Sequence, residues 1–223
     1  MLPSQTVENY LKTIYLAQAA LAPTETLVPM GQLASALRVV PGTATTMVKT
    51  LAESGLVRYE PYMGVRLTRA GEKLATLVLR RHRLIELFLV KVLGMSWAEV
   101  HDEAELLEHS VSERLIERID GMLGHPEVDP HGDPIPTAEG HMPRRDHFDL
   151  LAAPIATPLV VTRVSDQDPE FLRFVEHHHL MPGHDVLIEA RDDSSDAVRL
   201  RLDQGETITL GTRAASKVFA RPR

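Results

Sequence analysis

The stretch Val100–His109, which reads VHDEAELLEH, combines a helical pattern with four possible metal ligands. On a helix of about 3.6 residues per turn, His101, Glu105 and Glu108 lie along one face, and His109 flanks them. The opposite side is apolar and carries Val100, Ala104, Leu107 and Val111. Carboxylates three residues apart on a helix repel each other, so a divalent cation would stabilise this face. The simpler alternative is a polar face in contact with water.

Residues on both sides of this stretch could complete a metal site. Residues 69–93 are predicted to form a long helix, whose apolar surface is wide enough to be buried on several sides, one of them against a partner subunit. This helix carries His82 and Glu86 at i and i+4, a spacing at which both side chains can hold one ion. Further along, Asp129 and His131 lie in the sequence DPHG, a turn-like setting from which side chains can reach a metal.

The N-terminal part of the chain reads as a winged helix. A helix is predicted over residues 4–20, followed by a short helix over 30–37, a tight turn and a second helix that begins at Pro41. Alternation in residues 56–68, around a turn near Pro61–Gly64, predicts a β-hairpin. A helix-turn-helix followed directly by a hairpin is the order of a winged helix.

Small and hydroxyl-bearing residues at the start of the second helix suit entry into the major groove of DNA, which is about 12 Å wide. Their methyl groups can contact thymine, their hydroxyl groups can reach bases or phosphates, and nearby cations can contact phosphates. The candidate DNA-binding residues are Pro41, Gly42, Thr43, Thr45, Thr46, Lys49, Arg58 and Arg66. A winged helix that contacts only protein is the alternative.

The C-terminal part changes to short alternating segments separated by turns, starting at residue 159. This pattern predicts a small antiparallel barrel, with a helix of sequence DPEFLRFVEHH between its first two strands. Residues 124–158, before the barrel, are rich in Pro, Gly and His and are predicted to be mostly loop and linker. The run His177–His179 is interpreted as a polar helix end, with opportunistic metal binding as the alternative.

The composition of the 223 residues excludes several kinds of site. The absence of cysteine excludes disulfides, thiolate metal sites and a cysteine nucleophile. No run of about 18 apolar residues is present and no signal peptide is visible, so we expect a cytoplasmic protein without a membrane partner.

The charge is distributed unevenly around a net value of −7. Residues 1–75 carry 7 basic and 5 acidic side chains, whereas residues 76–223 carry 17 and 26. All 11 histidines lie between His82 and His184. A weakly basic head on an acidic, histidine-rich body is the distribution expected of a nucleic-acid reader joined to a cation binder.

The chain resembles, over nearly its whole length, the diphtheria toxin repressor family of metal-dependent transcriptional repressors. The stretches that carry the resemblance are ENYLKTIY, the winged helix, RRHRLIE, VHDEAELLEH, HPEVDPHGDPIP and the barrel. The resemblance implies a mainly α fold with a small all-β C-terminal domain. The implied domains are a winged helix-turn-helix (1–75), a helical dimerisation and metal-binding domain (76–143), a linker (144–157) and an SH3-like β-barrel (158–223).

The resemblance also implies two metal sites per subunit. The first would use Asn9, Glu105, Glu108 and His109. The second would use His82, Glu86 and His101, joined in a manganese-responsive branch by Asp129, His131 and Asp166. The chain departs from the family at two of these positions, because Asn9 stands where the family has Met or Asp, and Asp129 where that branch commonly has Cys.

The donor types predict which metal is bound. Hard carboxylate and amide oxygens suit Mn(II), while the imidazoles also allow Fe(II). The resemblance therefore implies a Mn(II)-dependent repressor of metal uptake genes, and not an enzyme, that binds palindromic double-stranded DNA operators as a homodimer. The alternatives are an iron-dependent regulator of the same family, a metalloenzyme with a carboxylate and histidine centre, and a winged-helix sensor of a small organic ligand.

Overall fold

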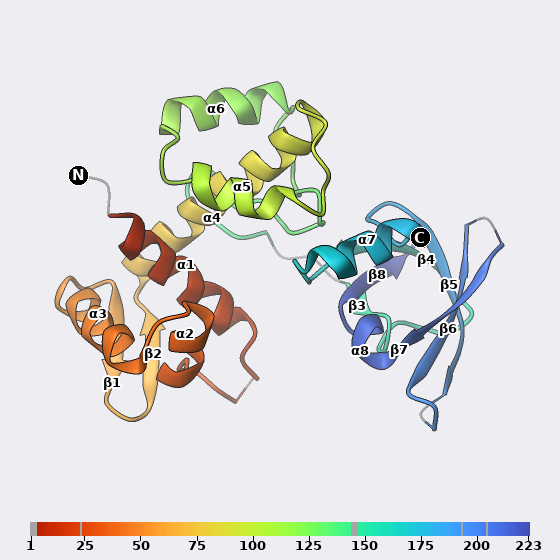
Figure 1. Ribbon diagram of the computed structural model, residues 1–223, viewed down its shortest axis with the longest axis horizontal. Coiled ribbons are helices and arrows are strands. Elements are labelled where there is room, and N and C mark those ends of the chain that lie inside the picture. Colours follow the sequence, from red (N-terminus) through yellow and green to blue (C-terminus); the bar gives the residue numbers. More distant parts are fainter. Residues whose placement is uncertain (1–3, 23, 144–146, 193, 204) are drawn as a thin grey trace. The chain divides into compact units, whose positions relative to one another are not determined.

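A computed structural model describes residues 4–22, 24–143, 147–192, 194–203 and 205–223 (Figure 1). The chain divides into two units, of which the first comprises 1–81 with 136–142 and the second 82–135 with 143–223. None of the helices in the described ranges is both long enough and apolar enough to cross a membrane.

The first unit is a winged helix, as the sequence predicts. Its helices are α1 (Gln5–Ala19), α2 (Met30–Ala36) and α3 (Pro41–Glu53), and its hairpin consists of β1 (Val57–Glu60) and β2 (Gly64–Leu67). The side chain of Ser4 caps α1 by accepting a hydrogen bond from the Val7 N–H. The apolar faces of these elements meet in one core, which contains Leu11, Ile14, Leu33, Val48, Leu51, Val57 and Val65.

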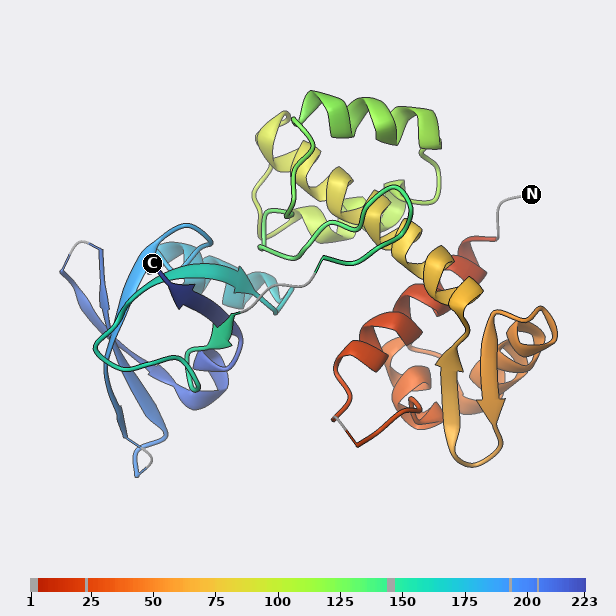
Figure 2. The ribbon, with the colours of Figure 1, turned by 180° about the vertical axis from the view of Figure 1, so that it is seen from behind.

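The hairpin is fixed to its unit through its second strand. Val28 and Val65 exchange two backbone hydrogen bonds of 2.8 and 3.0 Å, and the Leu67 N–H donates to the side-chain oxygen of Gln18 at 2.8 Å. An added Cβ at Gly64 would come within 2.5 Å of the Val28 carbonyl oxygen, so a larger residue there would displace the strand. The turn between the two strands projects beyond the helices of its unit (Figure 2).

The second unit contains a helical part and a barrel. The boundary between the units falls within α4 (Arg69–Lys91), which is followed by α5 (Val100–Leu107) and α6 (Glu113–Met122). The helical part has a small core of its own, which includes Leu84, Ile85, Leu87, Leu89, Val100, Ala104, Ile116, Ile119 and Ile135. Because α4 and α5 share this core, the histidines and carboxylates on the two helices lie next to one another.

Helix α5 differs from the prediction at its C-terminal end. The helix ends at Leu107, so Glu108 and His109 lie in the turn that follows it. Glu108 is fully buried, whereas Leu107, which was predicted to face the core, is 37% exposed. The reason is that the Glu108 side chain lies 2.7 Å from His82. This contact directs Glu108, and not Leu107, toward the interior.

The barrel is a six-stranded antiparallel sheet in the order β3-β8-β4-β5-β6-β7. Its strands are β3 (Phe148–Asp149), β4 (Pro158–Val164), β5 (Asp185–Asp192), β6 (Ala197–Leu202), β7 (Thr207–Gly211) and β8 (Val218–Pro222), and its helices are α7 (Pro169–His177) and α8 (Thr212–Ala215). Strand β5 carries irregularities in its register with β6, as does β4 with β8. Such bulges allow a short sheet to curve around a core.

The linker is shorter than the predicted 144–157. Residues 144–146 lie outside the described residues, but Phe148 and Asp149 pair with β8, and Leu150 and Ala153 are fully buried in the barrel core. Trp97, from the segment between α4 and α5, belongs to the same core. The barrel core therefore includes apolar side chains from outside the predicted barrel.

Candidate metal centre and DNA-binding face

Three groups of potential metal ligands meet around His82 and Glu86 on α4. Within each group the ligand atoms all lie within 4.8 Å of one another. The groups are His82 with Glu86 and His101, His82 with Glu105 and Glu108, and Glu86 with Asp129 and His131. The i, i+4 pair on α4 is thus the point at which α5 and the DPHG loop converge.

His82 lies between two buried carboxylates. Its Nδ1 is 2.7 Å from Oε2 of Glu108 and its Nε2 is 3.0 Å from Oε1 of Glu86. His101 approaches the same Glu86 oxygen, with its Nδ1 at 3.2 Å. Because carboxylates only accept hydrogen bonds, the His82 ring satisfies both only when both of its nitrogens carry a proton.

The charge state of Glu86 follows from these neighbours. Burial by itself raises the pKa of Glu86, but the charge of His82 and hydrogen bonds from His101 and His82 outweigh it, and they hold the pKa well below its usual value. Glu86 is therefore ionised although it is 1% exposed. A buried carboxylate among imidazoles is the kind of environment in which a divalent cation is held.

His131 is the clearest sign that this region fits a metal. Its Nε2 lies 2.8 Å from the backbone carbonyl oxygen of Trp97, which can only accept, so this nitrogen carries the proton. The other ring nitrogen, Nδ1, is buried without a hydrogen-bond partner and lies 3.9 Å from Oε2 of Glu86. An imidazole oriented by a carbonyl, with its free lone pair directed at a carboxylate, is the usual arrangement of a histidine ligand.

Asp129 shapes the loop and also faces this region. Its Oδ1 accepts the backbone N–H groups of His131 at 2.8 Å and Asp133 at 2.9 Å. Burial, and then the charges of Asp133 and Glu86, raise its pKa well above the usual value, although Arg83 lies 3.6 Å from its Oδ2. A cation would offset the same repulsion. The name loop group is used below for Glu86, Asp129 and His131.

Sequence reasoning missed two residues that support the loop group. Arg83 contacts both Asp129 and Asp133, and its position next to His82 in RRHRLIE was the available signal. Gly132 has a φ of 86°, and an added Cβ would come within 2.0 Å of the Thr162 carbonyl oxygen of β4. Nothing local in the sequence predicts that contact, because it depends on how the barrel packs against the loop.

The end of α5 supplies the second set of predicted ligands, here called the α5 group: Glu105, Glu108 and His109. Oε1 of Glu108 lies 3.3 Å from Nε2 of His109. Glu105 is partly exposed, and its Oε1 is 3.9 Å from His82 and 3.8 Å from His101. Glu105 and Glu108 therefore gather at Nδ1 of His82, whereas His109 contacts Glu108 and joins none of the three ligand groups found among the described residues.

Two predicted ligands are not part of these groups. Asn9 lies on α1 in the first unit, where its Oδ1 is buried without a hydrogen-bond partner. Asp166 follows β4 and forms an ion pair with Lys217. Burial raises the pKa of Asp166, but the hydrogen bond from Lys217 and other contacts outweigh burial, so the pKa is lower than usual. The participation of both residues in metal binding remains a prediction.

The His177–His179 run lies at the end of α7. The rings of His177 and His178 are 4.9 Å apart at their centroids, and none of the three histidines joins a ligand group among the described residues.

The predicted DNA-binding residues lie on α3 and the hairpin. Gly42, Thr43, Thr46 and Lys49 are exposed, while Ala44 and Val48 of the same helix are buried. The hydroxyl of Thr45 donates to the Pro41 carbonyl at 2.9 Å and that of Thr46 to the Gly42 carbonyl at 3.0 Å. With those protons engaged in the helix, the two side chains offer methyl groups and acceptor lone pairs to a ligand.

A winged helix joined to a buried set of oxygen and imidazole donors defines a metal-responsive DNA-binding regulator. Sequence models of three protein families match the chain: the N-terminal DNA-binding domain of iron-dependent repressors at residues 3–65, their metal-binding and dimerisation domain at 68–137, and the FeoA domain at 149–222. These matches agree with the predicted order of winged helix, helical domain and barrel.

Individual relatives agree with the family models. The regulator MntR of Lysinibacillus sphaericus is 33% identical over 129 residues, which are 58% of this chain and 89% of the relative. The iron-dependent repressor IdeR of Mycobacterium tuberculosis is 37% identical over 132 residues, 59% of this chain and 55% of the relative. A solved manganese-dependent transcriptional repressor in complex with manganese has a TM-score of 0.89 and 39% identity, covering 97% of this chain and 100% of that one.

The chain belongs to the diphtheria toxin repressor family of metal-dependent transcriptional repressors. Its relatives are regulators and not enzymes, so the predicted alternative of a metalloenzyme is set aside. The resemblance noted in the sequence is confirmed, and with it the mainly α fold that ends in a small β domain.

Proposed function

We propose that the chain is a manganese(II)-responsive repressor of metal uptake genes that binds palindromic operator DNA as a homodimer in the cytoplasm. The loop group carries this proposal, since Glu86, Asp129 and His131 are buried together and the Nδ1 of His131 has no hydrogen-bond partner. A bound cation would offset the repulsion between the Asp129 and Glu86 carboxylates, which burial strengthens.

The choice of metal rests on the chemistry of the donors. The chain has no cysteine, so the ligands are oxygens and imidazole nitrogens, which suit Mn(II). A manganese-dependent relative of the same fold supports this choice. Fe(II) is the second candidate, because imidazoles also bind iron and a relative is an iron-dependent repressor.

The ligand assignment extends the groups described above. His82, Glu86, His101, Asp129 and His131 would hold one ion, and Asp166 would join them if it is released from Lys217. The α5 group and Asn9 would hold a second ion. A bound divalent cation supplies positive charge that offsets the carboxylates, and the residues of this chain then determine how firmly α1 is held. Because two winged helices of a dimer must match two half-sites, holding α1 would favour the DNA-competent state.

The test uses duplex DNA selected by the full-length protein from a random library in the presence of MnCl₂. Fluorescence anisotropy of a selected duplex is measured as Mn²⁺ is added and then removed with EDTA, with MgCl₂ as the control cation. We expect affinity to rise about 100-fold with Mn²⁺ and to fall again with EDTA. Affinity that does not change with Mn²⁺ would contradict the proposal.

A further inference from the structure

Trp97, the single tryptophan of the chain, lies in the turn between α4 and α5 but packs in the core of the barrel. The Ser96 carbonyl accepts a hydrogen bond from the Glu99 N–H at 3.0 Å. This turn directs Trp97 and Ala98 into the barrel core, where they are 6% and 2% exposed. The indole therefore belongs to the barrel, although its backbone belongs to the helical part.

The same tryptophan makes two contacts with the ring of His131. The indole and the imidazole are stacked, with their centroids 5.2 Å apart and their planes 30° from parallel. In addition, Nε2 of His131 lies 2.8 Å from the Trp97 carbonyl oxygen. The stack fixes the plane of the imidazole, and the hydrogen bond fixes the direction of the ring within that plane. Together they determine the position of Nδ1, the buried nitrogen that would bind an ion.

Strand β4 of the barrel holds the backbone of His131 and of the residues that follow it. The Val164 N–H donates to the His131 carbonyl at 2.8 Å, and Nε of Arg163 lies 2.7 Å from Oδ1 of Asp133. Gly132 leaves no room for a Cβ against the same strand. The backbone of His131 is therefore fixed by the barrel sheet, and its ring by a residue of the barrel core.

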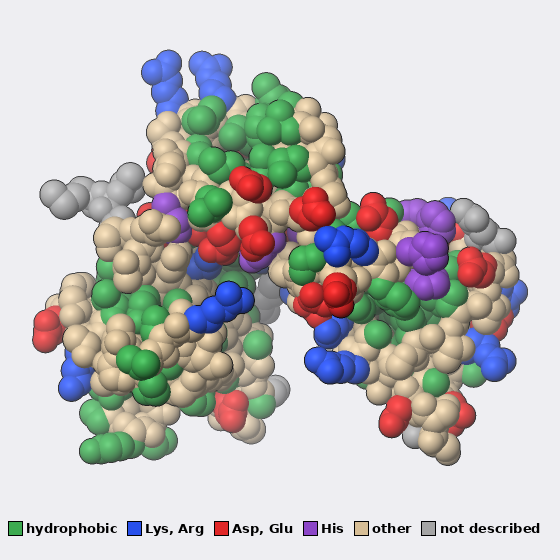
Figure 3. Space-filling view, in the orientation of Figure 1, with side chains coloured by type: hydrophobic (Ala, Val, Ile, Leu, Met, Phe, Trp, Pro, Cys, Tyr) green, Lys and Arg blue, Asp and Glu red, His purple; other side chains and the backbone are tan. Residues whose placement is uncertain are grey.

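The burial of the indole has an unfavourable side. Its Nε1 is buried without a hydrogen-bond partner among the described residues, whereas a buried tryptophan usually bonds this donor. What the large ring provides in return is contact with both the barrel core and His131. The histidines that Figure 3 shows on the surface of the barrel differ from His131, because His131 is 0% exposed and has no water to orient its ring.

We propose that Trp97 is a positioning residue through which the folded barrel core sets the affinity of the loop group for a divalent cation. A ring that is already oriented loses less conformational freedom when the ion binds, so the loop group has its full affinity only with Trp97 packed against His131. By linkage, an ion held at His131 in turn stabilises the barrel. The inference rests on the proposed function, since it requires the loop group to bind a cation, and it adds how that site is controlled.

The test compares the full-length wild type with Trp97→Leu and Trp97→Phe by calorimetric titration of the metal-free proteins with MnCl₂. The site that His131→Ala weakens identifies the loop group in these titrations. We expect Trp97→Leu, which removes the stacked ring, to lower the Mn²⁺ affinity of that site about ten-fold, the smaller effect of a residue that orients a ligand. Trp97→Phe keeps an aromatic ring and should restore most of the affinity. Trp97→Met takes the place of Trp97→Leu if the latter does not fold.

A matched control comes from the same core. Leu200 is fully buried on β6, which pairs with β5 and β7 and not with β4. Leu200→Ala should lower the midpoint of thermal unfolding in EDTA, because it leaves a cavity in the barrel. It should leave the Mn²⁺ affinity unchanged, because the contacts of Trp97 with His131 remain.

The fluorescence of Trp97 supplies a second measurement that needs no folded variant at this position. Because the indole lies in the barrel core, its thermal transition reports the unfolding of that core. We expect MnCl₂ to raise the midpoint of this transition in the wild type relative to EDTA. The rise should be smaller in His131→Ala, which keeps the tryptophan but lacks the imidazole.

Four outcomes would overturn the inference: wild-type Mn²⁺ affinity in a folded Trp97→Leu protein, an equal loss of affinity in Leu200→Ala, no recovery of affinity in Trp97→Phe, or a wild-type fluorescence transition that does not move with MnCl₂. Failure of the proposed function looks different. If His131→Ala binds Mn²⁺ as the wild type does, the loop group is not the site. If His131→Ala loses affinity and Trp97→Leu does not, only the positioning by Trp97 is wrong.

Discussion

The loop group and the α5 group are built differently, although both adjoin His82. Every predicted ligand of the loop group is 4% exposed or less and comes from one unit, and the DPHG backbone fixes two of them. The α5 group contains the partly exposed Glu105, and its predicted fourth ligand, Asn9, belongs to the other unit. We propose that the loop group binds its ion permanently and that occupancy of the α5 group acts as the switch.

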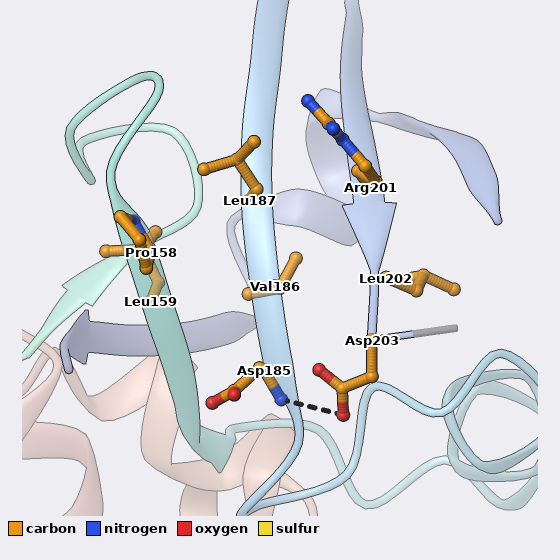
Figure 4. A pocket seen from close by; sticks show the side chains of 8 residues that line it. All are labelled: Pro158, Leu159, Asp185, Val186, Leu187, Arg201, Leu202 and Asp203. Atoms are coloured by element: carbon orange, nitrogen blue, oxygen red, sulfur yellow. Dashed lines mark hydrogen bonds between the residues drawn. The ribbon is translucent and has the colours of Figure 1, made fainter. Parts of the chain in front are cut away.

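The barrel has a surface pocket of a different kind, whose polar groups already have protein partners. A shallow pocket of about 270 Å³ lies over β4, β5 and β6 (Figure 4), where Asp203 accepts a hydrogen bond from the Asp185 N–H at 3.1 Å. Asp185 also pairs with Arg223 at 2.7 Å. Its polar groups are thus satisfied by protein neighbours, unlike Nδ1 of His131.

The largest effect is expected from removing the imidazole of His131, whose Nδ1 has no hydrogen-bond partner. His131→Ala should weaken Mn²⁺ binding at this group by about 100-fold. The variant loses a residue that would bind the metal directly, and loss of a residue that only orients a ligand already lowers metal affinity 10- to 100-fold. Isothermal titration calorimetry with MnCl₂ measures the change. The matched control is His125→Ala, since His125 is 77% exposed and pairs with Asp120. Equal losses of Mn²⁺ affinity in the two variants would show that His131 is not a specific ligand.

The second effect tests whether the loop group depends on its backbone. Gly132→Ala should destabilise the protein by about 2 kcal/mol or more, because the added Cβ meets the Thr162 carbonyl oxygen at 2.0 Å. Gly124→Ala is the control, with a φ of 76° and open space around the added atom, so it should cost about 1 kcal/mol. Urea unfolding in EDTA measures both free energies. A smaller effect at Gly132 than at Gly124 would show that the loop can move away from the barrel.

The third prediction concerns a substitution that should strengthen metal binding at the α5 group. Asn9→Asp replaces a neutral amide with a carboxylate, and we expect it to lower the Mn²⁺ concentration for half-maximal DNA binding by about ten-fold, since hard divalent ions bind carboxylates more strongly. Anisotropy titrations of a selected duplex measure this midpoint. No shift in the midpoint would remove Asn9 from the site.

The smallest effect concerns the buried charge of the loop group in the absence of metal. The pKa of Asp129 is raised in the folded state, so between its usual value and the raised one the folded protein binds more protons than the unfolded chain, and stability falls as pH rises through that window. The Asp129→Asn variant has no carboxyl to deprotonate, so its stability should not fall in this way. It should be more stable than the wild type by about 1 kcal/mol at pH 7.

Urea unfolding in EDTA at pH 4 and pH 7 measures that difference. The variant should gain stability at pH 7 and little at pH 4. A variant less stable than the wild type at pH 7 would show that the ion pair with Arg83 outweighs burial at this carboxylate.

The sequence predicted what depends on local pattern. The winged helix followed from the order of its elements, and His82 with Glu86 followed from their i, i+4 spacing on one helix. What depends on tertiary packing was predicted wrongly or missed. Glu108 is buried and Leu107 exposed because a contact with His82 decides where α5 ends, and Leu150 joins the barrel because β3 pairs with a strand about 70 residues further along. The pairing of Asp166 with Lys217 has the same origin.

We propose that the loop group binds its ion without Asn9, whereas the DNA-competent state requires Asn9. The most direct measurement is equilibrium dialysis of Asn9→Ala against Mn²⁺, followed by anisotropy with a selected duplex on the same sample. We expect the variant to keep one tightly bound ion per chain and to lose Mn²⁺-dependent DNA binding. An Asn9→Ala protein that binds DNA with the wild-type Mn²⁺ dependence would contradict it.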